Sequence, residues 1–127
     1  MTVRSGSPYE DRYGFVRGRQ VGSRVLVAGT APIPAPGEEL PSGPYAQMRR
    51  CGEIALEALA AMGAEARHVV RTRMYITDPS IADEVGRAHR ELFGAGDPVA
   101  TMVVVAGLID PAWLVEIEVE AEVDGDS

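Results

Sequence analysis

The chain has 127 residues, with 12 basic residues that are all arginine, 19 acidic residues and a net charge of −7 at pH 7. The absence of lysine excludes lysine Schiff-base and pyridoxal-phosphate chemistry and a Walker A phosphate loop, and the acidic surplus disfavours a nucleic-acid partner. The length suits a single domain, and we assign residues 1–127 to it, with the core at about residues 13–123 and flexible termini.

Location and cofactors are constrained by what the sequence lacks. No apolar run approaches the roughly 18 residues of a membrane span, and the first residues contain no apolar signal segment, so we expect neither a membrane partner nor secretion. The single cysteine, Cys51, cannot form an internal disulfide, which favours the cytoplasm. Cys51, His68 and His89 show no metal-ligand spacing. We therefore expect no metal and no cofactor.

The first half of the chain predicts a hairpin, a loop and a helix. Residues 24–30 (RVLVAGT) are rich in β-branched residues, which is typical of a strand, and residues 13–23 supply the other arm of a hairpin. The proline- and glycine-rich residues 30–44 predict a loop. A helix is predicted to start at Pro44 and to end near Gly63. Its apolar face recurs at steps of three and four and consists of Met48, Cys51, Ala55, Leu59 and Met62.

The second half predicts a strand, a helix and two more strands. Residues 68–77 alternate as a strand does, residues 78–79 (Asp-Pro) predict a helix start, and Gly94 predicts its end. Residues 99–108 are apolar on both faces, and residues 115–123 (VEIEVEAEV) alternate apolar and acidic side chains, so both predict strands. The order β-β-α-β-α-β-β with right-handed crossovers predicts an α+β, two-layer fold with both helices on one face of the sheet.

The other face of this sheet lacks a helical cover, and we expect it to pack against further copies of the chain. Residues 24–30 and 99–105 carry apolar side chains on both faces, whereas a half-solvated strand would alternate. Apolar area left in water forfeits about 25 cal/mol per Å², so an uncovered apolar face of several hundred Å² favours association. The expected product is a homo-oligomer closed through the helix-free face.

The closing strand raises the question of what its acidic side chains face. The four acidic residues are Glu116, Glu118, Glu120 and Glu122. With the apolar residues of this strand toward the helices, the glutamates point to the oligomer interior or its clefts, where Arg71 and Arg73 can meet them. A cross-strand pair contributes only about 0.2–1 kcal/mol, whereas an unpaired carboxylate in an interface costs several kcal/mol. The alternative is that the glutamates form a solvated face.

The order of the elements and four segments resemble the RidA/YjgF family, the reactive intermediate deaminases formerly called endoribonuclease L-PSP. The segments are VLVAGTAPI (25–33), YAQMRRCGEIALEALAAMGA (45–64), HVVRTRMYITD (68–78) and GDPVATMVVVAGLIDPAWLVEIEVEA (96–121). The resemblance implies a chorismate-mutase-like fold in which three subunits join their sheets into a central barrel with the helices outside. It also implies that a small-molecule ligand binds in the clefts between neighbouring subunits.

Family members with deaminase activity hydrolyse enamines and imines, such as 2-aminoacrylate, to 2-keto acids and ammonia without a cofactor. The resemblance implies that a glutamate of the last strand positions the attacking water, and Glu116 in LVEIE matches it. Pairing an interfacial arginine is the alternative role of Glu116. The resemblance further implies a cleft lined by an early tyrosine and by a Ser-Gly-Gln stretch of the second strand, from which this chain departs by lacking the tyrosine hydroxyl and the serine. The matching residues are Phe15, Ala28, Gly29 and Thr30.

One departure from the family pattern bears on the substrate. Ala100 stands where the family has an arginine that grips the substrate carboxylate, and losing a hydrogen-bonded charge pair removes about 1.5–3 kcal/mol of binding. We therefore expect a substrate other than a simple 2-imino acid, unless Arg17, Arg71 or Arg73 reaches the cleft in its place.

Three further residues are candidates for the cleft. Thr101 and Met102 follow Ala100, and Thr101 could donate a hydrogen bond to a ligand. Trp113 lies after a turn and could form a cleft wall, with subunit packing as the alternative; for Phe15 the alternative is core packing.

Two functions stay open at this point. The first is a cofactor-free hydrolase of an enamine or imine, and the second is a non-catalytic trimer that binds a small ligand. Ribonuclease activity, which the older family name suggests, conflicts with the net charge of −7 and the absence of lysine.

Overall fold

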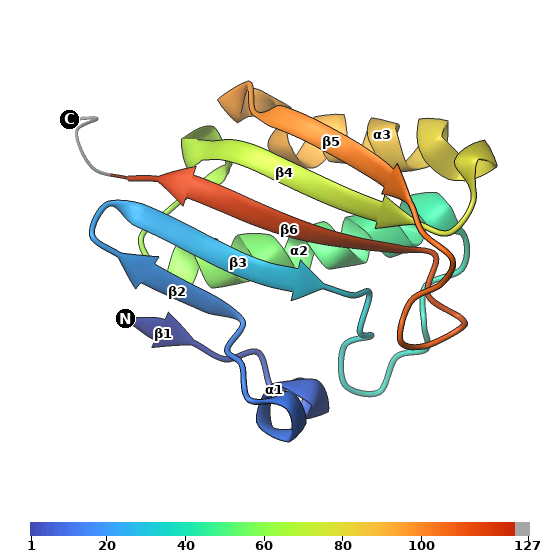
Figure 1. The fold of residues 1–127 in the computed structure, drawn as a ribbon, viewed down its shortest axis with the longest axis horizontal. Coiled ribbons are helices and arrows are strands. Elements are labelled where there is room, and N and C mark those ends of the chain that lie inside the picture. Colours follow the sequence, from blue (N-terminus) through green and yellow to red (C-terminus); the bar gives the residue numbers. More distant parts are fainter. Residues whose placement is uncertain (124–127) are drawn as a thin grey trace.

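The computed structural model describes residues 1–123. The chain folds into a six-stranded mixed sheet with two long helices on one face (Figure 1). The strands are β1 (Thr2–Val3), β2 (Gly18–Val21), β3 (Arg24–Thr30), β4 (Val69–Ile76), β5 (Val99–Val104) and β6 (Val115–Glu122). The helices are α1 (Pro8–Tyr13), α2 (Pro44–Ala61) and α3 (Ala82–Phe93), with single 3-10 turns at Ala66–His68, Pro79–Ile81 and Gly94–Gly96. Among the described residues, no helix is both long and apolar enough to cross a membrane.

The strand order β1-β2-β3-β6-β4-β5 places the last strand in the middle of the sheet. β4 and β5 pair in parallel, and all other neighbours pair antiparallel. The connections through α2 and α3 both join strands that run in the same direction, and right-handed crossovers bring both helices to the same face. This arrangement confirms the two-layer α+β fold that the sequence predicts.

The core lies between the sheet and the two long helices. The apolar side chains of β6 point toward the helices and are at most 1% exposed; they are Val115, Ile117, Val119 and Ala121. The apolar face predicted for the helix after Pro44 is buried in full, from Met48 to Met62. The alternation predicted for the last strand and the steps of three and four predicted for the helix are both confirmed. Each element buries only one side, and its apolar residues recur with the spacing that places them on that side.

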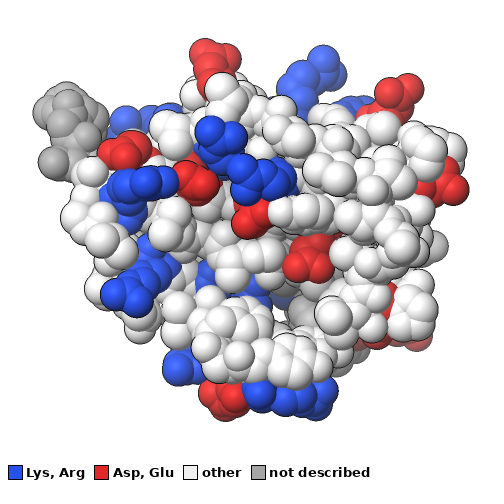
Figure 2. All heavy atoms as spheres, in the orientation of Figure 1, with Lys and Arg blue, Asp and Glu red and all other residues white. Residues whose placement is uncertain are grey.

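The helix-free face carries a ladder of charged side chains along its centre (Figure 2). The register pairs Arg71 with Glu120 and Arg73 with Glu118, and Arg24 of β3 reaches the carboxylate of Glu120 at 2.6 Å. Figure 2 shows acidic and basic side chains next to one another across the centre of this face, with a mostly uncharged surface over β5. The apolar part of this face is therefore confined to its flanks, while arginines meet the central glutamates as the sequence predicts.

The first fourteen residues contain two elements that the sequence analysis did not predict, β1 and α1. The signals for α1 are present: the Ser7 hydroxyl accepts a hydrogen bond from the Tyr9 N–H at 3.3 Å, and Pro8 occupies the first turn. Gly14 ends the helix with a φ of 79°, which favours glycine. At the other end of the chain, the expectation of a flexible terminus falls on residues 124–127, which lie outside the described residues.

Candidate functional site

A cavity of about 590 Å³ lies between α1, the end of β3 with the loop that follows it, α2, and the loop before β6. Its volume is within the range of small-molecule sites. Apolar and aromatic side chains make up most of the wall, and polar side chains form the smaller part of it. The charged residues among them are Arg4, Arg17, Arg50, Glu57 and Glu116.

Glu116 brings a half-buried carboxylate to this cavity from the start of β6. Burial raises the pKa of Glu116, the nearby Arg17 guanidinium opposes the rise, and the charge of Glu118 adds to it. Within the described residues, Glu116 forms no ion pair and no side-chain hydrogen bond. A carboxylate with a raised pKa and no protein partner is available to hold a water molecule or to exchange a proton with a ligand.

Gly29 on β3 makes room for this carboxylate. A Cβ atom built on Gly29 would lie 2.5 Å from Oε2 of Glu116, which is closer than real Cβ contacts come. The pairing of β3 with β6 shifts register between Val27 and Thr30, so the strands are irregular at this point. A residue without a side chain thus lets the glutamate lie against the backbone of β3.

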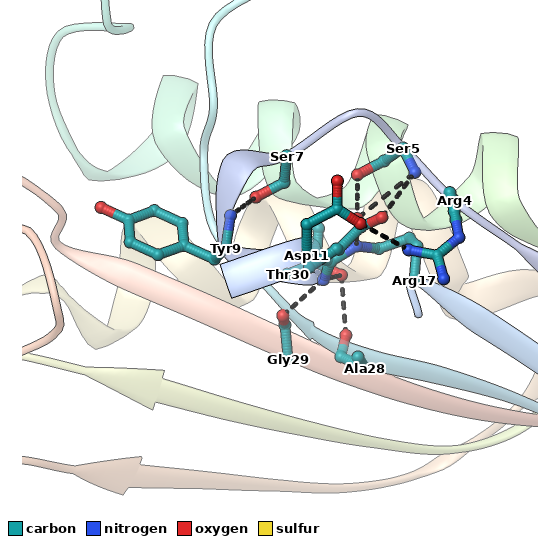
Figure 3. A network of polar contacts seen from close by, with 10 residues as sticks. Arg4, Ser5, Ser7, Tyr9, Asp11, Arg17, Ala28, Gly29 and Thr30 are labelled. Atoms are coloured by element: carbon teal, nitrogen blue, oxygen red, sulfur yellow. Dashed lines mark hydrogen bonds and ion pairs between the residues drawn. The ribbon is translucent and has the colours of Figure 1, made fainter. Parts of the chain in front are cut away.

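Arg17 fixes the end of β3 beneath the cavity (Figure 3). Its side chain is buried, and its Nη1 donates hydrogen bonds to the Gly29 carbonyl at 2.6 Å and to the Thr30 hydroxyl oxygen at 3.1 Å. The Thr30 hydroxyl in turn donates to the Ala28 carbonyl at 2.7 Å. The guanidinium of Arg17 can stay buried because its N–H donors find acceptors on β3.

The same guanidinium ties helix α1 to the sheet. Nε of Arg17 donates to Glu10 at 3.1 Å, and the Glu10 carboxylate also accepts from the backbone N–H and the hydroxyl of Ser5, at 3.1 Å and 2.5 Å. From α1, the ring of Tyr9 packs edge-on against Trp113, with ring centroids 5.9 Å apart. The N-terminal segment is therefore a wall of the cavity that a buried ion pair holds in place.

Five of the nine predicted site residues line this single cavity. They are Glu116, Phe15, Gly29, Thr30 and Trp113. Ala28 instead borders a smaller hollow on the helix-free face. Ala100, Thr101 and Met102 lie on β5, which β4 separates from β6, so one chain by itself does not bring them to the cavity.

The three arginines proposed as substitutes for the family arginine are now distinguished by position. Arg17 lines the cavity that contains Glu116. Arg71 and Arg73 lie on the helix-free face, border the smaller hollow and pair with Glu120 and Glu118. Of these three arginines, Arg17 alone lines the cavity of Glu116 in the same chain.

The surroundings of His89 and Cys51 indicate that these two residues have structural roles. Nε2 of His89 lies 2.7 Å from the Thr72 hydroxyl, and burial lowers the pKa of His89. The thiol of Cys51 is buried against β6, and burial raises its pKa well above the ordinary value, which makes it a poor nucleophile. Within residues 1–123, no three His, Cys, Asp or Glu side chains come together as a metal site would require.

The contribution of the N-terminal segment to the cavity was not predicted from the sequence. Ser5, Tyr9 and Tyr13 line the cavity, and Glu10 holds Arg17. The sequence pattern Ser-Pro followed by two acidic residues and a glycine could have predicted α1. No sequence pattern marks the pairing of Glu10 with Arg17, because this contact depends on how the segment folds back over the sheet.

Comparisons with known proteins agree with this architecture. A family model described as Endoribonuclease L-PSP matches residues 9–123. An uncharacterised protein of Streptomyces coelicolor is 43% identical over 119 residues, which cover 94% of this chain and 89% of the relative.

Solved structures give the same result. A crystal structure of a YjgF/YER057c/UK114 family member from Mycobacterium tuberculosis has a TM-score of 0.84 and 41% identity, covering 97% of this chain and 98% of that one. RidA from an Antarctic Psychrobacter shares the fold, with a TM-score of 0.82 at 21% identity over 96% of this chain and 94% of its own. The chain belongs to the endoribonuclease L-PSP family, whose members include YjgF and RidA.

Proposed function

We propose that this protein hydrolyses a reactive enamine or imine to a carbonyl compound and ammonia, without a cofactor. The observation that carries the proposal is the carboxylate of Glu116, which has no ion-pair partner among residues 1–123, has a raised pKa and lies in a cavity of about 590 Å³. Family membership supports a deaminase- or hydrolase-like role on a small metabolite in general terms. The single, buried Cys51 suits the reducing cytoplasm, where we propose that the protein acts.

In the proposed reaction, an enamine reacts as its imine tautomer, protonated on nitrogen. The Glu116 carboxylate takes a proton from water while the water oxygen bonds to the carbon of the C=N group, which gives a carbinolamine. The Glu116 carboxylic acid then returns the proton to nitrogen, and the C–N bond breaks with its electron pair going to nitrogen. The hydroxyl proton passes to the departing ammonia, so that the products are a carbonyl compound and ammonium.

We propose that the working form is a homotrimer whose clefts combine two chains. The observations in support are the uncovered face of the sheet and the edge strand β5, where Val99 and Val104 are exposed. In such a trimer, β5 of a neighbouring copy would bring Ala100, Thr101 and Met102 toward the cavity of Glu116. Light scattering at micromolar concentration is expected to give three times the chain mass of 13.5 kDa, and a mass of one chain would contradict this proposal.

Simple 2-imino acids are not the proposed substrates, because Ala100 offers their carboxylate no charged partner. RNA is not proposed either. The sheet arginines are paired with glutamates, as for Arg73 with Glu118 at 3.3 Å, and Figure 2 shows no uninterrupted basic area on this face. A nucleic-acid surface would need unpaired positive charge.

The proposed function is tested by ammonia release from a panel of imines generated in solution, 2-aminoacrylate among them, measured above the uncatalysed rate. We expect acceleration of at least one carboxylate-free imine, loss of that acceleration in Glu116→Ala, and full activity in the control Glu122→Ala, because Glu122 lies at the far end of β6. No acceleration of any imine, or equal rates for wild type and Glu116→Ala, would contradict the proposal.

A non-catalytic trimer that binds a small ligand is the second candidate, and the observation that favours it is the alanine at position 100. The two candidates separate in the variant Ala100→Arg. If Ala100→Arg gains activity on 2-aminoacrylate, the hydrolytic framework is retained and the substrate has shifted. If neither protein accelerates any imine, the binding function is favoured.

A further inference from the structure

Each of the three arginines that line the cavity has a neighbouring carboxylate. Arg17, which is 5% exposed, pairs with Glu10, which is 2% exposed, at 3.1 Å. Arg4 pairs with Asp11, also at 3.1 Å. The third arginine of the wall, Arg50, lies 3.8 Å from Glu53 and donates a hydrogen bond to the backbone of the loop after β3.

The negative charges of the same wall are not matched. Within the described residues, neither Glu57 nor Glu116 lies within 4 Å of an arginine side chain. Glu57 is exposed at the rim on α2, while Glu116 is half-buried at the base on β6. A ligand that enters the cavity therefore meets two carboxylates that form no ion pair within the described residues, and three arginines that each already have a carboxylate neighbour.

The remaining wall suits an apolar, ring-sized group. Tyr9, Tyr13, Phe15 and Trp113 line it, and Tyr9 contacts Trp113 edge-on. The guanidinium of Arg12 lies over the rings of Tyr9 and Tyr13, at 5.3 Å and 5.9 Å from their centroids, from outside the cavity. Aromatic faces attract cations, and this wall already holds one.

We propose that the cavity selects a cation: the amine or iminium form of a ligand that has an aromatic-sized apolar body and no carboxylate. The proposal rests on the proposed function, because it concerns the substrate class of the site that contains Glu116. An iminium cation places its positive charge at the C=N group that Glu116 would hydrolyse, so the same interaction binds the ligand and orients it. A carboxylate-bearing ligand would instead bring a third negative charge close to Glu57 and Glu116.

The fluorescence of Trp113 provides a direct binding assay, because it is the only tryptophan in the chain and lines the cavity. The probes are 2-phenylethylammonium and 3-phenylpropionate, which share a ring and a two-carbon spacer and differ in the sign of the charge. With the full chain at neutral pH, we expect the ammonium probe to bind at least about tenfold more tightly than the carboxylate. Equal affinities, tighter binding of the carboxylate, or no binding of the ammonium probe by calorimetry would overturn the proposal.

Two variants assign the preference to the unpaired carboxylates. Glu116→Gln and Glu57→Gln each keep the shape of the side chain and remove one negative charge, and each is expected to reduce the preference for the ammonium probe by about threefold or more. The control Glu122→Gln makes the same change in net charge on the sheet face and should leave the preference unchanged. An unchanged preference in both cavity variants, or an equal loss in the control, would overturn the proposal.

The outcome is separable from that of the proposed function. If the ammonium probe binds with the stated preference but no imine is hydrolysed, the charge selection stands and the hydrolytic function fails. If imines are hydrolysed with Glu116 but the probes show no preference by charge, the function stands and the proposed substrate class fails.

Discussion

Replacing Glu10 with alanine is expected to destabilise the protein far more than the same replacement of a glutamate on the surface. The Glu10 carboxylate is buried and is the acidic partner of Arg17 at 3.1 Å. The Arg17 side chain is buried as well and is fixed by hydrogen bonds to β3. The variant Glu10→Ala leaves a guanidinium charge buried without its partner, and it also removes the acceptor for the Ser5 hydroxyl and N–H.

Breaking a buried ion pair by removing one partner costs about 3–5 kcal/mol. With an unfolding entropy of about 2.1 cal/mol/K per residue, a chain of this length is expected to lose roughly 10–20 °C in Tm. The matched control is Asp11→Ala on the same helix. Asp11 also pairs with an arginine at 3.1 Å, but its side chain is 94% exposed, so removing this pair should cost at most about 1 kcal/mol.

Urea unfolding followed by Trp113 fluorescence and by far-ultraviolet circular dichroism measures this difference. Trp113 contacts Tyr9 of α1, so its fluorescence also reports whether α1 detaches before the sheet unfolds. The double variant Glu10→Ala with Arg17→Met should recover part of the loss, since it removes the unpaired charge. If Glu10→Ala loses no more stability than Asp11→Ala, the buried pair does not hold the N-terminal segment as described.

Three further variants follow from the same packing. Gly29→Ala places a methyl group 2.5 Å from the Glu116 carboxylate, and it should abolish ammonia release while far-ultraviolet circular dichroism stays unchanged. Gly52→Ala drives a methyl group to 2.4 Å from an α3 side chain and should lower the free energy of unfolding by about 1–3 kcal/mol. Burial lowers the pKa of His89 from 6.5, so the unfolded chain binds the proton more tightly and stability falls as pH drops below 6.5. His89→Gln, whose amide can still bond Thr72, should flatten that fall in urea titrations at several pH values.

The layers of the fold could be predicted because the buried face of each strand or helix follows from the spacing of apolar residues within that element. The alternation in residues 115–123 identified the buried side of β6, and the steps of three and four after Pro44 identified the buried face of α2. The pairing of Arg73 with Glu118 followed from the same alternation. In a sheet that is covered on one side, the spacing of the apolar residues directly identifies which face of each element is buried.

The site could be predicted only in part, because it depends on contacts between distant residues. Glu116 and Gly29 were identified through the family resemblance, and β3 and β6 do bring them together. The wall from α1 was missed because a six-residue helix has no apolar stripe, and a buried Glu10 is exceptional for a charged residue. Ala100 could not be placed near Glu116 because β4 lies between β5 and β6 in a single chain.

The dependence of ammonia release on pH tests the role of Glu116 most directly. Because burial raises the pKa of Glu116 above its ordinary value of 4.5, the carboxylate form is lost earlier as pH falls, and the rate on the best imine substrate should decline with a midpoint above 4.5. In Glu116→Gln the rate should be low and this decline should be absent. A decline of the same midpoint and a comparable rate in Glu116→Gln would show that another group carries the reaction.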